Sequence, residues 1–145
     1  MSMLHRGLQL KIIWFDCHMS ELELCASNGQ FAGRTSFYAG LDEPKRLAQC
    51  IAGFPRSESD CREYELGGSD LPGHGGAKIR FSCKDSKGHL FVQVTICNAP
   101  VNKKEIIQSV VMQIDTVPAS IDSFVHDLNR MQLKIGDEAT LNNET

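Results

Sequence analysis

The segment 77–97 restricts the fold more than any other part of the chain, because apolar and polar residues alternate in it over two runs. Ile79 and Phe81 alternate with Lys78 and Arg80 in the first run, and the second run, LFVQVTIC, has the same period. A period of two residues predicts strands that each have one buried and one exposed face. The Asp-Ser-Lys-Gly sequence between the runs is typical of a tight turn. The segment therefore predicts an antiparallel hairpin at the centre of a sheet.

Five further segments are predicted as strands from the same signals. The first is expected to bury Leu10, Ile12 and Trp14 on one side, although Ile13 interrupts the polar residues on the other side. The last is apolar on both sides, which predicts an interior strand in the middle of the sheet. These five strands lie at residues 8–14, 21–27, 34–39, 61–68 and 106–114.

Two helices are predicted from apolar residues at helical spacing. One follows Asp42, which stands at the N-cap position, and the other buries Ile121 and Phe124. The elements have the order βββαββββα. This order predicts a single α+β domain at residues 1–136, in which a mostly antiparallel sheet of six or seven strands carries both helices on one face. Residues 137–145 are polar and are predicted to form a frayed C-terminal tail.

The composition excludes several classes of protein. The 145 residues are 41% hydrophobic and 23% charged, as in ordinary globular proteins. A formal net charge of -3 provides no basic surface for phosphates, so we expect no nucleic acid partner. No apolar run is long enough to cross a membrane, so we expect no membrane insertion. The 6 scattered cysteines fit reduced thiols better than a disulfide framework, which favours a cytoplasmic location.

No motif predicts a catalytic residue, a cofactor or a metal site. The chain has no C-x-x-C pair, and the adjacent Cys17 and His18 would point to opposite faces of a strand. His74 lies in a glycine-rich loop between Gly67 and Gly76, where an exposed backbone is able to approach a ligand closely. A flexible connection is the simpler interpretation of this loop, because it lacks the lysine and the Ser or Thr of a phosphate-binding loop.

The polar sides of the predicted strands leave one surface without a structural role. If the helices cover one face of the sheet, the other face exposes charged side chains together with an aromatic ring, a composition that suits a protein partner. We therefore predict a protein-binding face that contains Lys78, Arg80, Phe91, Gln93, Glu21 and Glu23.

The chain also shows a resemblance that extends from Leu22 to Leu128. Its successive motifs F-x-G-R-T-S-F-Y-A-G-L, G-F-P, E-L-G-G, R-F-S-C-K-D-S-K-G-H and I-D-S-F-V-H-D-L look like those of WapI-type immunity proteins of bacterial polymorphic toxin systems and their relatives. The resemblance implies a protein that binds a toxin and needs no cofactor or catalytic residue. Acidic immunity proteins commonly mask a basic toxin surface. The residues that carry the resemblance are Phe31, Gly33, Leu41, Phe54, Pro55, Gly67, Phe81, Asp85, Gly88, His89, Phe124 and Leu128.

Three hypotheses about the role of this protein follow from these observations. The first is a non-enzymatic protein-binding domain, with a toxin-neutralising immunity protein as its specific form. The alternative is a small-ligand-binding protein or enzyme with a pocket between sheet and helices, near the Gly67–Gly76 loop and His74 or His89. In the third, the exposed strand face joins two copies of the chain in a homodimer.

Overall fold

The computed structural model describes residues 6–68, 75–98, 102 and 104–143 of the chain. These residues form eight strands and two helices, among them all seven predicted strands and both predicted helices. The α+β class is therefore confirmed. The elements are β1 (Gly7–Phe15), β2 (Ser20–Ser27), β3 (Ala32–Ala39), α1 (Glu43–Ile51), β4 (Cys61–Gly67), β5 (Gly75–Cys83), β6 (Leu90–Asn98), β7 (Gln108–Thr116), α2 (Pro118–Arg130) and β8 (Glu138–Asn142).

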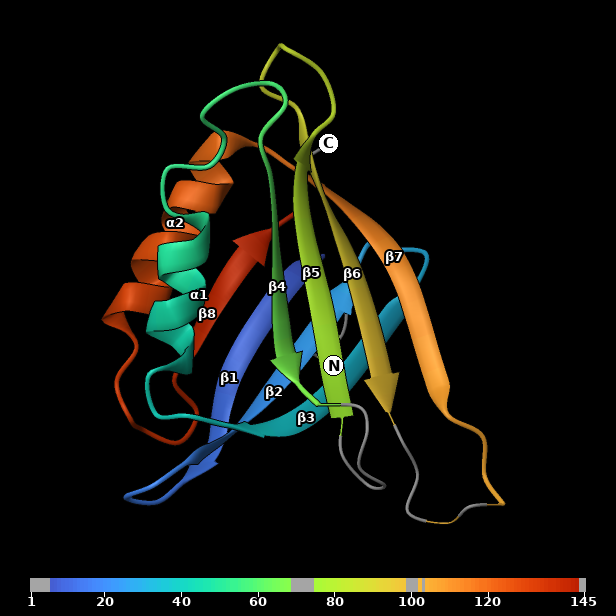
Figure 1. Ribbon diagram of the computed structural model, residues 1–145, viewed down its shortest axis with the longest axis vertical. Helices are drawn as coiled ribbons and strands as arrows, with labels where there is room; N and C mark the ends of the chain where they lie inside the picture. Colours follow the sequence, from blue (N-terminus) through green and yellow to red (C-terminus); the bar gives the residue numbers. More distant parts are fainter. Residues whose placement is uncertain (1–5, 69–74, 99–101, 103, 144–145) are drawn as a thin grey trace.

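The strands form two antiparallel sheets of four strands each, so the prediction of a single sheet with six or seven strands is wrong. Sheet A has the order β3-β2-β1-β8, and sheet B has the order β4-β5-β6-β7. The sheets pack on each other with their strands crossing at a large angle (Figure 1). Alternation of apolar and polar residues is the same in one large sheet and in two packed sheets, because each strand buries one face in both cases.

The two sheets lie close together where β3 crosses behind sheet B (Figure 1). Two glycines permit this approach. A Cβ atom on Gly33 would lie 2.7 Å from a methyl group of Val110, and a Cβ atom on Gly75 would overlap the hydroxyl of Thr35. Asn98, at the end of β6, holds the crossing in place. Its amide oxygen accepts a hydrogen bond from Thr35 Oγ1 at 2.7 Å, and its amide nitrogen donates one to a backbone carbonyl of β3 at 3.1 Å.

One hydrophobic core fills the space between the sheets and the helices. Most predicted inner residues of the central hairpin are buried, including Ile79 and Phe81, whereas Ala77 and Cys83 at its ends are only partly buried. The helices pack on each other, with α2 also against β8 and α1 against β4. They therefore lie along one side of the two sheets (Figure 1) rather than on one face of a single sheet. Phe54, just beyond α1, packs on Phe81 with the ring centroids 6.1 Å apart.

The C-terminal residues 138–142 form a strand, so the prediction of a frayed tail is wrong for them. Strand β8 pairs antiparallel with β1, and Ala139 and Leu141 are buried in the core. The hydroxyl of Thr116 donates a hydrogen bond to the carbonyl of Asn142 at 3.1 Å. Two buried positions in a polar segment are too weak a pattern to identify a strand, and pairing with β1 supplies the missing stabilisation.

Strand β7 lies at an edge of sheet B, so the prediction of a mid-sheet strand is wrong. The preceding residues Ile106 and Ile107 are 76% and 64% exposed, and Val111 within the strand is 59% exposed. Apolar residues occupy both sides of this segment because some of them face solvent, not because the strand is buried on both faces.

Trp14 lies on the opposite face of β1 from the one predicted. The pairing of β1 with β2 shifts between Ile12 and Trp14, which is the signature of a β-bulge. The additional residue, Ile13, turns Trp14 toward solvent, where its side chain is 40% exposed. The same shift places Phe15 against the core. In the sequence, the sign of this bulge was Ile13, an apolar residue on the otherwise polar side of the predicted strand.

Candidate functional site

The structure divides the predicted protein-binding face between two surfaces. Lys78, Arg80, Phe91 and Gln93 lie on the outer face of sheet B, at alternating positions of β5 and β6. Glu21 and Glu23 lie on the outer face of sheet A, because they belong to β2. The prediction that all six residues share one face is therefore wrong, because it assumed a single sheet.

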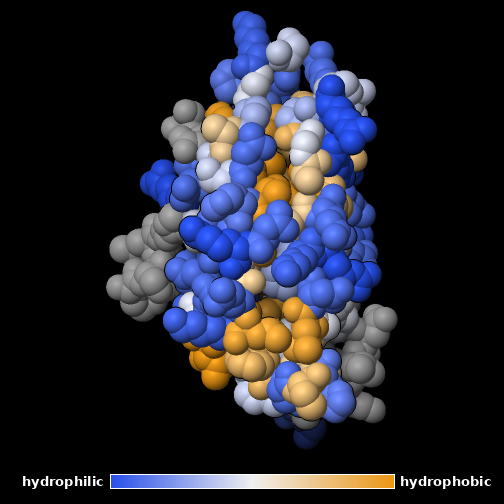
Figure 2. Space-filling model, turned by 90° about the vertical axis from the view of Figure 1, so that its left-hand side faces the viewer, coloured by the Kyte–Doolittle hydropathy of each residue, from blue (hydrophilic) through white to orange (hydrophobic). Residues whose placement is uncertain are grey.

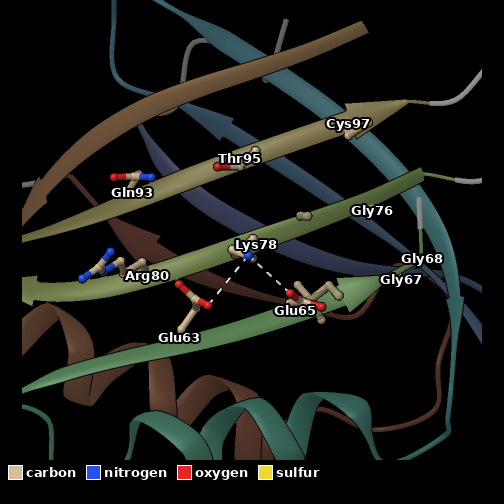
Figure 3. A pocket seen from close by; sticks show the side chains of 12 residues that line it. Glu63, Glu65, Gly67, Gly68, Gly76, Lys78, Arg80, Gln93, Thr95 and Cys97 are labelled. Carbon is tan, nitrogen blue, oxygen red and sulfur yellow. Dashed lines mark ion pairs between the residues drawn. The ribbon is translucent and has the colours of Figure 1, made fainter. Parts of the chain in front are cut away.

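A shallow groove with a volume of about 750 Å³ runs along the outer face of sheet B. Figure 3 shows Lys78 on β5 between two carboxylates of β4. Its Nζ lies 3.8 Å from Glu63 and 3.4 Å from Glu65. Lys78 and Glu63 are half-exposed and Glu65 is mostly exposed, so these ion pairs contribute little to stability. They do hold charges of both signs at defined places, with Thr95 beside Lys78 and Gln93 beside Arg80 on β6 (Figure 3).

Arg80 extends the polar lining of the groove toward the start of β4. Its Nε donates a hydrogen bond to Cys61 Sγ at 3.3 Å, and Ser82 Oγ lies 3.6 Å from the same sulfur. The hydrogen bond from Arg80 lowers the pKa of the Cys61 thiol, and Ser82 acts in the same direction. Burial instead raises the pKa of the Cys50 thiol. Sequence reasoning missed Cys61, because only the pairing of β4 with β5 brings it beside Arg80.

A row of three side chains crosses the outer face of sheet A. Trp14 on β1 is opposite Glu21 on β2, which is opposite Tyr38 on β3. The Trp14 and Tyr38 rings are 6.2 Å apart between centroids and stand at 89° to each other. Both rings are substantially exposed, at 40% and 48%. Sequence reasoning missed this row, because the bulge at Ile13 is needed to bring Trp14 to the outer face.

Apolar side chains also gather below the two helices in Figure 2. A groove of about 400 Å³ in this region, between the start of α1 and the end of α2, includes Leu41, Pro44 and Leu133 in its lining. Leu133 is 43% exposed, and Ile135 in the same loop is 64% exposed. The loop that joins α2 to β8 is therefore a second exposed apolar region, besides the start of β7.

The predicted loop site is described only in part. His74 lies outside the described residues, whereas Gly67 and Gly76 line one end of the groove on sheet B. His89 has a local partner, because its Nδ1 lies 2.6 Å from Asp85 Oδ2 across the turn between β5 and β6. This hydrogen bond, together with the backbone N–H of Lys87, holds the pKa of Asp85 below its usual value.

Within the described residues, no group of three or more His, Cys, Asp or Glu side chains is arranged to hold a metal ion. The two helices of this part of the chain are too short and too polar to span a membrane. No family model matches the chain, and neither a curated protein nor a solved structure matches it significantly.

Proposed function

We propose that this protein is a non-enzymatic protein-binding domain that recognises its partner through the outer face of sheet B. The observation that carries the proposal is the groove on this face, which is lined by charges of both signs and by neutral polar groups. Phe91, on the same face, and the exposed Val111 of β7 add apolar contact area. Such a mixture of apolar and charged groups is typical of non-obligate protein interfaces.

The arrangement of the charges favours specificity over general attraction. Lys78 already has two carboxylate neighbours, and Arg80 already bonds Cys61, so neither cation depends on a partner for its position. Charges held in place before binding favour partners with a matching pattern and disfavour others. The groove contains as many basic as acidic side chains, so it does not select a partner by net charge.

As the specific form of this function, we propose a toxin-neutralising immunity protein. The support comes from the motif resemblance between Leu22 and Leu128 and from the net charge of -3, which suits a basic toxin. The test is co-expression with the toxin encoded beside this gene. Wild-type protein should restore growth, and a Lys78→Glu/Arg80→Glu variant should not. If the wild-type protein gives no protection, or no toxin gene lies nearby, the immunity function is wrong.

The binding function has its own test. Immobilised wild-type protein is expected to retain a partner from lysate of the organism that encodes it, and the Lys78→Glu/Arg80→Glu variant is expected to lose that partner. Asp122→Lys, on the exposed side of α2, is the matched control because it changes charge away from the outer faces of both sheets. Equal retention by all three proteins would show that the groove is not the binding surface.

Two further hypotheses are tested by separate measurements. The alternative hypothesis of a small-ligand-binding protein or enzyme placed its pocket between sheet and helices, where the structure has the hydrophobic core. The groove at Gly67 and Gly76 lies instead on the outer face of sheet B, and a ligand bound there would raise the melting temperature in a panel of metabolites. A homodimer would sediment at twice the monomer mass at micromolar concentration.

A further inference from the structure

We propose that Trp14, Tyr38 and Glu21 form a site for the cationic end of a lysine or arginine side chain of a partner protein. This site goes beyond the groove, because it lies on the outer face of sheet A. The proposed protein-binding function is needed only to identify the occupant of this site. The site itself is testable with small cations.

The two aromatic rings form adjoining walls of the site. They stand at 89° to each other with centroids 6.2 Å apart, so the face of one ring meets the edge of the other. The face of an aromatic ring carries partial negative charge, and tryptophan attracts a cation more strongly than other aromatic residues do. The rings come from β1 and β3, which are held by the strand between them, so their separation is set by the sheet.

Glu21 supplies a full negative charge to the same place. It lies between Trp14 and Tyr38 in the cross-strand row and is partly buried. Within the described part of the chain, no cation pairs with it. A carboxylate on the strand between two aromatic residues favours a cation over a neutral or anionic group.

The neighbouring charges on this face are already paired with one another. Lys11 Nζ lies 3.9 Å from Glu138, and Arg34 Nε lies 4.0 Å from Glu23. The cations nearest along the strands therefore have other carboxylates as partners. Glu21 differs from these carboxylates in having two aromatic neighbours in place of a basic one.

The occupant follows from this chemistry. A lysine or arginine side chain reaches the rings with its aliphatic stem and presents its charge to Glu21, which satisfies the apolar and the ionic parts together. The guanidinium group of arginine also stacks on aromatic faces. The negative net charge of the chain favours the approach of a partner with such residues.

The test uses the fluorescence of Trp14, which is the only tryptophan of the chain. The probes are the N-acetyl N-methylamides of arginine and lysine, with the norleucine compound as the neutral control, at constant ionic strength. We expect a saturable fluorescence change with both cationic probes and none with the norleucine compound. A linear response, or the same response to all three probes, would overturn the proposal.

Variants separate the site from a general effect of charge. Glu21→Gln and Tyr38→Leu are each expected to raise the half-saturating concentration by about two- to fivefold. Glu23→Gln is the matched control, because it removes a carboxylate of the same strand that already has Arg34 as a neighbour at 4.0 Å, and it should change this concentration little. Circular dichroism melts should show that all three variants fold. If Glu21→Gln and Glu23→Gln behave alike, Glu21 has no role in the site.

Partner capture then distinguishes this proposal from the groove. If the Lys78→Glu/Arg80→Glu variant loses the partner while Glu21→Gln retains it fully, the groove is the interface and the cation site does not contact the partner. If Glu21→Gln weakens capture and the groove variant does not, the proposed function of the groove fails and the cation site stands.

Discussion

The Nε–H of Arg80 on β5 donates a hydrogen bond to the Sγ of Cys61 on β4, over 3.3 Å. This contact joins a residue predicted for the binding face to one that sequence reasoning did not select. It stabilises the thiolate more than the thiol and so lowers the pKa of Cys61. Burial and neighbouring carboxylates act in the opposite direction on the Cys83 thiol and raise its pKa.

The first prediction concerns thiol reactivity. Iodoacetamide should modify Cys61 faster than Cys25, Cys50 or Cys83, because the thiolate is the nucleophile and only Cys61 among these four has a lowered pKa. The Arg80→Leu variant should slow the modification of Cys61 by about two- to tenfold at neutral pH. Peptide mass spectrometry at several times of reaction measures both effects. An unchanged rate in Arg80→Leu would show that the guanidinium does not control the thiol.

The second prediction concerns the inner face of the central hairpin. Phe81 is fully buried and packs against Phe54, so Phe81→Ala should lower the free energy of unfolding by about 3–5 kcal/mol. Val111→Ala on the exposed face of β7 is the control and should change it by less than about 0.5 kcal/mol. Urea denaturation measures both values. Similar small losses in the two variants would contradict the burial of Phe81.

The third prediction tests the crossing of the two sheets. A Cβ atom on Gly75 would overlap the hydroxyl of Thr35 and lie 2.6 Å from the carbonyl oxygen of Ser36. Gly75→Ala should therefore destabilise the protein by about 1–3 kcal/mol, because the sheets must move apart. Gly68→Ala is the matched control, since nothing lies within 4 Å of its added Cβ. Equal melting temperatures for the two variants would mean that β3 does not pack this closely on β5.

The fourth prediction concerns stability at alkaline pH. Burial, and then Glu43, raise the pKa of Tyr64 from 10.0 to about 12. The phenol of the unfolded chain releases its proton first, so rising pH favours unfolding. The contribution of the neutral phenol to stability is complete below pH 10.0 and is lost as the pH rises toward about 12.

Tyr64→Phe removes this titration. Between about pH 8 and about pH 11, the wild-type protein should lose more free energy of unfolding than the variant does. Urea denaturation at both pH values gives the loss in free energy of unfolding for each protein. The difference between the two losses reports on Tyr64, because the other groups titrate alike in both proteins. Parallel losses in both proteins would show that Tyr64 titrates alike in the folded and unfolded states.

Residue patterns along the chain determined the secondary structure except for β8, and they determined which side of most strands is buried. Ile79 and Phe81 are buried and Lys78 and Arg80 are exposed, as alternation predicts, because burial of one strand face is a local property of the pattern. The positions of both helices were predictable for the same reason. The candidate groove was predictable only in part, through Lys78, Arg80 and Gln93.

The tertiary structure decided which strands share a sheet and which side chains meet. Alternation identifies a buried face but not the layer that covers it, so Glu21 and Lys78 were assigned to one surface although they lie on different sheets. Strand β8 is stable through its pairing with β1 rather than through its own composition. The meeting of Trp14 with Tyr38 required both a bulge and a three-strand register, because one inserted residue reverses the face of every side chain that follows it.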